Sequence, residues 1–143
     1  IAPFVSLIHA VDSLKLLKEI NKQAQKNDRT IDCLLQFHIA EESSKFGLDW
    51  NEAEALLNSE EYAQLGHIRI VGVMGMATFT NDTEQVRNEF RQLKGIYDKL
   101  KANFFSDNEA FKEISMGMSG DYQIALEEGS TMVRVGSLLF GAR

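Results

Sequence analysis

The sequence has little cysteine and little proline, and its hydrophobic runs are short. The single cysteine, Cys33, excludes a disulfide within the chain. It lies in the apolar run 31–35, where we expect a buried, unreactive thiol, because reactive cysteines need an electropositive and partly exposed setting. The longest apolar run, 70–77, is far shorter than the ~20 residues of a membrane helix. These absences predict a chain without membrane partners in a reducing compartment, the cytoplasm.

An excess of positive charge is also absent. The 143 residues carry a formal net charge of -6 and have a pI near 5.1. Binding to a nucleic-acid backbone needs a basic face, so we expect no nucleic-acid partner. Small anions held by local backbone N–H groups remain compatible with this charge. Hydrophobic residues make up 44% and charged residues 25%, which are globular values and exclude general disorder.

Apolar runs typical of strands alternate with amphipathic runs typical of helices. The expected strands are residues 4–8, 31–37, 68–76, 111–116 and 131–135. Between them, the expected helices are residues 12–26, 49–57, 59–65, 81–100 and 121–128. Asp49 and Glu52 form a capping-box pattern, and Asn81 with Glu84 predicts the start of the longest helix. No glycine- or serine-rich tract interrupts the alternation, so we expect a single domain over residues 1–143.

A strict strand–helix alternation predicts a parallel sheet, either an open doubly wound sheet or part of a (β/α)₈ barrel. Open nucleotide-binding sheets usually carry a glycine fingerprint after an early strand, and none follows 4–8 or 31–37. Barrels often build a phosphate site from the loops after their last two strands. Here the last two strands carry the Gly/Ser loops, which favours a partial barrel. The first residues resemble the middle of a buried strand, so we expect a truncated chain.

The two Gly/Ser loops are the sharpest candidate site. In the run 115–121, Gly117 and Gly120 permit close approach of backbone to a ligand, and Ser119 occupies the expected N-cap of the next helix. A phosphate is stabilised by such a helix start. Gly136 and Ser137 offer further donors from the neighbouring strand. The simpler alternative is a tight turn and a capped helix with no ligand.

Arg134 is embedded in an apolar strand, where a guanidinium needs a partner. Two interpretations are open. It pairs structurally with an acid such as Glu113 or Asp121, or it donates to a ligand.

Three sequence segments resemble those of a known family, the pyridoxal phosphate homeostasis proteins. The first is a C-terminal signature made of Ser-Met-Gly-Met-Ser-Gly-Asp at 115–121, Ala-Leu-Glu-Glu-Gly-Ser-Thr-Met-Val-Arg-Val-Gly-Ser at 125–137 and Phe-Gly-Ala-Arg at 140–143. The other two are Ile-His-Ala-Val-Asp-Ser at 8–13 and Val-Gly-Val-Met-Gly-Met at 71–76. The resemblance covers nearly the whole chain. It implies an α/β fold, a partial (β/α)₈ TIM barrel of the alanine-racemase N-terminal-domain type, with about strands 4–8 present. The first three βα units would be missing.

The resemblance implies that pyridoxal 5′-phosphate (PLP) is the cofactor. Serine hydroxyls and backbone N–H groups of the two loops would contact its phosphate, Arg134 would face the pyridine nitrogen, and Met76 would line the pocket near the ring. A permanent cation beside the ring nitrogen disfavours its protonation and weakens the ring as an electron sink. The cofactor-binding residues so implied are Ser115, Met116, Gly117, Ser119, Arg134, Gly136, Ser137 and Met76.

The Schiff-base lysine of the family lies on the first barrel strand and is absent from this chain. The nine lysines of the sequence fall on expected helices, on a loop (Lys45) or near the start of a strand (Lys112). The family's Asn-Ile after the second strand of this chain is replaced by His38-Ile39. No catalytic residue is therefore assigned. The histidines His9, His38 and His67 stand far apart in the sequence, so no metal ligand is assigned either.

Two hypotheses follow from the resemblance. The first is a PLP-binding protein that acts in intracellular PLP homeostasis as a carrier, without robust catalysis. Its partners would be PLP and PLP-dependent apo-enzymes, and it would be a monomer or weak dimer. The second is a PLP-dependent racemase or decarboxylase, which would need an acid/base partner and usually a second domain.

A serine hydrolase is disfavoured, since no histidine follows Ser119. The adjacent glutamates, such as Glu127 and Glu128, are expected on solvated faces.

Overall fold

The protein forms one parallel β-sheet with strands in sequential order. Its structure, a computed structural model, describes residues 7–40, 47–118 and 120–134. The strands are β1 (Leu7–Val11), β2 (Ile31–Gln36), β3 (Ile68–Met74), β4 (Glu113–Met118) and β5 (Met132–Arg134), in the order β1-β2-β3-β4-β5. Every neighbouring pair is parallel. The predicted strand–helix alternation is confirmed.

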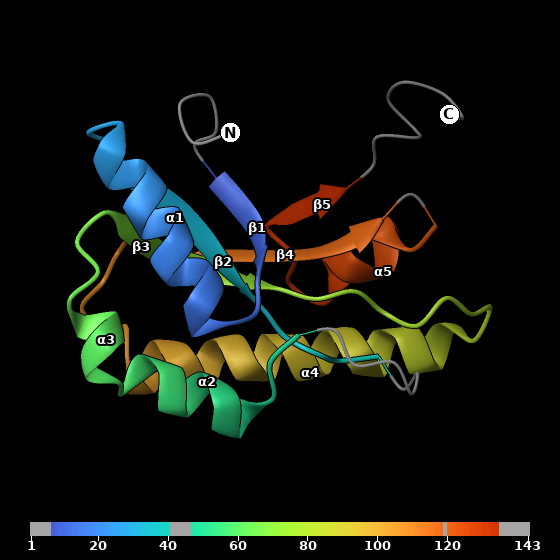
Figure 1. Cartoon of the computed structure of the whole chain (residues 1–143). Coiled ribbons are helices and arrows are strands. Elements are labelled where there is room, and N and C mark those ends of the chain that lie inside the picture. Colours follow the sequence, from blue (N-terminus) through green and yellow to red (C-terminus); the bar gives the residue numbers. More distant parts are fainter. Residues whose placement is uncertain (1–6, 41–46, 119, 135–143) are drawn as a thin grey trace.

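The helices cover one face of this sheet (Figure 1). They are α1 (Leu14–Lys26), α2 (Trp50–Leu57), α3 (Glu60–Ala63), α4 (Thr83–Asn103) and α5 (Tyr122–Glu127). Buried residues of α1, α2, α4 and α5 belong to one core with outward-facing strand residues. A doubly wound sheet would reverse its strand order and carry helices on both faces. The sequential order and the single helical layer therefore identify a half-barrel and exclude the open-sheet alternative.

The other face of the sheet is concave and carries its own small cluster. Leu34, Val71 and Met74 are buried there, and Leu7 and Met132 pack against them. Along β2, Cys33 and Leu35 belong to the helix-side core while Leu34 belongs to the concave cluster. This alternation is the two-residue period of a strand covered on both faces.

Local capping signals set most helix starts. The side chain of Ser13 accepts a hydrogen bond from Leu16 N (3.1 Å), and Asp49 and Glu52 form the predicted reciprocal capping box. The predicted cap Asn81 is wrong by one residue. The N-cap of α4 is Asp82, whose carboxylate accepts from Gln85 N at 3.2 Å. A carboxylate at this position also interacts favourably with the positive end of the helix dipole.

Two strand boundaries differ from their predictions. β1 extends to Val11, beyond the predicted end at residue 8, and residues 4–6 lie outside the described part. β4 begins at Glu113 because Phe111 serves the helix layer instead of the sheet. The Phe111 ring stacks on Phe105 and Tyr97, with ring centroids 4.2 Å and 5.1 Å apart.

The predicted apolar stripe of α4 is confirmed, since Val86, Phe90, Leu93 and Leu100 are buried. Cys33 is fully buried in the same core, as predicted, and burial raises its pKa to about 12. Among the described residues, the helices are all too short or too polar to cross a lipid bilayer.

Candidate functional site at the carboxyl ends of the strands

All five strands are parallel, so their carboxyl ends meet at one rim of the half-barrel. Ligand sites of barrels lie at this rim. Met76 follows β3 and Arg134 ends β5 at this rim, and Ser115, Met116 and Gly117 lie within β4. The rim is therefore the candidate site, and the concave face beneath it forms its floor.

Ser115 points into the concave face. It is fully buried, and its hydroxyl lies 3.3 Å from Nδ1 of His9, which comes from β1, 106 residues earlier. The neighbours of Ser115 on β4, Ile114 and Met116, belong to the helix-side core. The strand alternation therefore places Ser115 alone of the three on the inner face. The sequence did not predict His9 as a site residue. Its contact with Ser115 joins β1 to β4 and depends on the curvature of the sheet.

Met116 and Gly117 follow Ser115 along β4 and are in contact with the helix layer. The side chain of Met116 is fully buried in the helix-side core and faces away from the concave surface. Gly117 has a φ of +100°, and a Cβ there would lie 2.6 Å from Cβ of Ala125. Gly117 is thus required for α5 to pack against β4. The second glycine, Gly120, has open space around its Cα and no left-handed φ.

The loop between β4 and α5 differs from the prediction. The N-cap of α5 is Asp121, not Ser119, which lies outside the described residues. The Asp121 carboxylate accepts from Met118 N at 2.7 Å and makes no capping hydrogen bond to α5. The carboxylate therefore closes the loop on itself and does not cap the first turn of α5.

A serine and a threonine that the sequence analysis missed join β4 to β5. The Ser130 hydroxyl lies 2.7 Å from the carbonyl oxygen of Met132 and 2.8 Å from that of Met116. Thr131 Oγ1 accepts from Ile114 N at 2.7 Å. These bonds fix the spacing of the two strands whose loops form the predicted phosphate site. Both residues lie in the segment 125–137 that carries the family resemblance, but the sequence pattern does not predict these hydrogen bonds.

The predicted contacts on the last strand are only partly within the described region. Arg134 ends β5, opposite Met118 in the register, and its side chain lies outside the described part. Gly136 and Ser137 also lie outside it. Of the two acids considered as partners of Arg134, Glu113 accepts from Thr131 Oγ1 at 2.7 Å, and Asp121 holds Met118.

Met76 lies on the connection between β3 and α4 and is 41% exposed. This connection is held by Glu89 of α4, which is 3% exposed. Its carboxylate accepts from both the backbone N and the hydroxyl of Thr78, each at 2.7 Å, and from Nε2 of Gln85 at 3.2 Å. A buried carboxylate with this many donors rigidly positions the loop that carries Met76.

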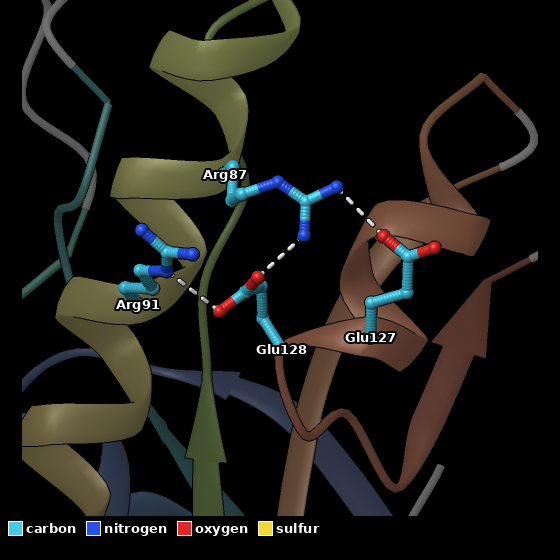
Figure 2. A network of polar contacts seen from close by, with 4 residues as sticks. All are labelled: Arg87, Arg91, Glu127 and Glu128. Carbon is cyan, nitrogen blue, oxygen red and sulfur yellow. Dashed lines mark hydrogen bonds and ion pairs between the residues drawn. The ribbon is translucent and has the colours of Figure 1, made fainter.

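Charged residues attach α5 to α4 (Figure 2). Arg87 donates to Glu127 at 2.7 Å and also to Glu128, and Arg91 donates to Glu128 at 2.9 Å. The prediction that Glu128 lies on a solvated face is wrong, because its side chain is only 12% exposed. Hydrogen bonds from Arg87 and Arg91 lower its pKa. The network fixes the short helix that follows the Gly117 turn.

The described lysines, which are all but Lys45, lie away from the concave face. Seven are on α1 or α4, and Lys112 immediately precedes the amino end of β4, on the opposite rim from the site. Several are engaged elsewhere: Lys18 pairs with Glu61, and Lys101 donates to the carbonyl oxygens of Asn108 and Phe111. In the described ranges, no group of three or more metal-ligating side chains is found.

The comparisons with known proteins identify the family of this chain. A family model described as "Alanine racemase, N-terminal domain" matches residues 3–143. The chain is 39% identical over 140 residues to the pyridoxal phosphate homeostasis protein of Aquifex aeolicus, covering 97% of this chain and 59% of that protein. It is 34% identical over 146 residues to that of Homo sapiens, covering 99% of this chain and 52% of the relative. The chain thus spans little more than half the length of these curated relatives.

Solved structures give the same picture. PipY of Synechococcus elongatus with PLP bound has a TM-score of 0.79 and 29% identity, covering 95% of this chain and 61% of that one. The alanine racemase of Clostridium difficile has a TM-score of 0.62 at 16% identity, which shows a shared fold alone. The fold predicted from the sequence resemblance is confirmed as that of the alanine racemase N-terminal domain.

Proposed function

The chain belongs to the alanine racemase N-terminal domain family, and on that premise we propose that it forms part of a PLP-binding protein of PLP homeostasis. The observation that carries the proposal is the PLP-bound PipY structure, which superimposes on 95% of this chain at 29% identity. Curated relatives from bacteria to mammals carry the name pyridoxal phosphate homeostasis protein. PLP and PLP-dependent apo-enzymes are the proposed partners.

The residues at the rim fit a phosphorylated aromatic cofactor. The concave floor combines apolar Met74 with the buried hydroxyl of Ser115, as sites for amphipathic small molecules do. The Gly117 turn leads from β4 into the β4–α5 loop at the rim. The first turn of α5, which the Asp121 side chain does not cap, would present N–H groups where a phosphate is favoured. In this proposal the loop groups at 117–121 and 136–137 hold the phosphate.

Arg134 is proposed to face the ring nitrogen and Met76 to border the ring. An arginine keeps its positive charge at all physiological pH values, so it opposes protonation of that nitrogen. PLP supplies an electrophilic aldehyde and an electron-withdrawing ring when bound. An unprotonated ring withdraws electrons less, which suits storage and transfer of the cofactor better than turnover.

The five strands are proposed to be the last five of the barrel, strands 4–8, with the lysine that holds the aldehyde on a strand outside this chain. The eight described lysines support this, since they lie on the helical layer or the opposite rim.

We further propose a cytoplasmic protein, monomeric or weakly dimeric. The runner-up is a racemase or decarboxylase, which would need an acid/base side chain beside the ring.

The test is titration of the full-length protein with PLP, followed by its visible absorption spectrum and by mass mapping after borohydride reduction. The expected result is stoichiometric binding with the covalent adduct on a lysine outside residues 1–143. Absence of binding, or an adduct on a lysine of this chain, would overturn the proposal. Racemase and decarboxylase assays with a panel of amino acids separate the runner-up, which predicts multiple turnovers.

A further inference from the structure

One polar side chain on the concave face has no partner among the described residues. Gln36 is the last residue of β2 and is 7% exposed. Leu34, two residues earlier, lies in the concave cluster, whereas Leu35 lies in the helix-side core. Alternate residues of a strand share a face, so the carboxamide of Gln36 faces the concave side.

The backbone of Gln36 is satisfied and its side chain is not. The Gln36 carbonyl accepts from Leu48 N at 2.8 Å. The carboxamide, which has two N–H donors and an acceptor oxygen, makes no hydrogen bond within residues 7–40, 47–118 and 120–134. Buried polar groups are nearly always paired, and an exception needs an explanation. A leucine or methionine would fill this position at lower cost in free energy.

The strand register places Gln36 at the level of the candidate site. Gln36 is the partner of Met74 on β3, and Met74 is the partner of Ser115 on β4. The three residues therefore form a row across the concave face at the carboxyl end of the sheet. Ser115 in turn lies 3.3 Å from His9 of β1. The polar side chains of His9 on β1, Gln36 on β2 and Ser115 on β4 thus share the concave face with the apolar side chain of Met74.

We infer that the Gln36 carboxamide is a ligand-binding group that hydrogen-bonds a polar substituent of the PLP ring. This inference rests on the proposed function and deepens it. The phosphate-holding loops follow β4 and β5, and Gln36 lies two strands away from β4. It is therefore assigned to the ring and not to the phosphate. The ring hydroxyl and aldehyde oxygens are acceptors for an amide N–H.

The experiment replaces Gln36 by methionine in the full-length protein, with Leu35→Met as the matched control. Leu35 is also buried, adjacent in sequence and on the opposite face. For Gln36→Met we expect the Kd of PLP to rise on the order of tenfold, as for loss of one hydrogen bond. The Kd of pyridoxal, which lacks the phosphate, should rise by the same factor, while competition by inorganic phosphate is unchanged.

The melting temperature without PLP gives the second readout. We expect Gln36→Met to melt at the same or a higher temperature than wild type, because it removes an unpaired buried amide. A lower melting temperature of the variant would show that the amide is paired within the protein and would overturn the inference. Equal PLP affinities of wild type and Gln36→Met would overturn the inference about Gln36 and leave the proposed function intact. A wild-type protein that does not bind PLP would overturn both.

Discussion

The carboxylate of Glu89 accepts hydrogen bonds from both the backbone N–H and the hydroxyl of Thr78, at 2.7 Å each. Glu89 is almost completely buried in the middle of α4, and Thr78 lies on the connection from β3 that also carries Met76. A single side chain of the outer helical layer thus fixes the loop at the rim of the candidate site.

Glu89→Gln should destabilise the fold by roughly 1–3 kcal/mol. The new side chain has an NH₂ group in place of one carboxylate oxygen, and this group cannot accept a hydrogen bond from Thr78. The measurement is urea unfolding, with amide hydrogen exchange at Thr78 as the local readout. Glu84→Gln, an exposed acid in the first turn of the same helix, is the control and should change stability by less than ~1 kcal/mol. Equal effects of the two substitutions would contradict a specific role for Glu89.

Gly117→Ala should destabilise the protein, since it forces a left-handed φ on alanine and brings its Cβ within 2.6 Å of Ala125. The expected loss is about 1–3 kcal/mol, accompanied by weaker PLP binding because α5 is displaced. Gly120→Ala is the matched control. Its Cβ would meet open space, so stability should stay the same or rise slightly. A reversal of this order would refute the assigned roles of the two glycines.

Arg87→Met should lower the melting temperature by a few degrees, because it removes the hydrogen bonds that Arg87 donates to Glu127 and Glu128. The Lys18–Glu61 pair is a useful comparison, because both of its side chains are more than half exposed. Lys18→Met should have almost no effect, as is usual for exposed ion pairs. Thermal unfolding of both variants followed by circular dichroism tests the difference.

Acid should remove the stabilising contribution of Glu128. Hydrogen bonds from Arg87 and Arg91 lower the pKa of its carboxyl below the unfolded value. The contribution is therefore fully present above the unfolded pKa and is lost as the pH falls through the lowered one. The difference in unfolding free energy between wild type and Glu128→Gln should be largest near neutral pH and shrink below about pH 4. A difference that is constant across urea titrations from neutral to acid pH would argue against this linkage.

Cys33 should resist thiol reagents in the folded protein. It is fully buried, and burial raises its pKa to about 12, so the reactive thiolate is scarce at neutral pH. Labelling with an aromatic disulfide reagent should be slow and should become complete in denaturing urea. Rapid stoichiometric labelling without denaturant would show that the thiol is accessible and would contradict the packing around β2.

Patterns that depend on neighbouring residues could be interpreted from the sequence. The capping box of Asp49 and Glu52 involves residues three apart, and the α4 stripe from Val86 to Leu100 follows helix periodicity. The βα alternation is also local, and it was enough to predict a parallel sheet. The Gly/Ser segments at 115–121 and 136–137 predicted the candidate phosphate loops, because small residues beside a helix start can present backbone N–H groups to an anion.

Contacts between distant elements could not be predicted in the same way. No local pattern predicts that Glu128 pairs with two arginines some forty residues earlier in the chain. Phe111 is a residue type common in strands, but its ring stacks in the helix layer. Asn81 and Asp82 are both good caps, and only the geometry of α4 selects Asp82.

The sequence by itself determined the order of strands and helices, the helix start at Asp49, the burial of Cys33 and the family resemblance, because each depends on local periodicity or on contiguous residues. Only the tertiary structure decided that all helices cover one face and that β1 to β5 lie in order. It also brought His9 to Ser115 and left the amide of Gln36 buried at the rim. The curvature and register of a parallel sheet set these relationships, and they join residues that no local pattern connects.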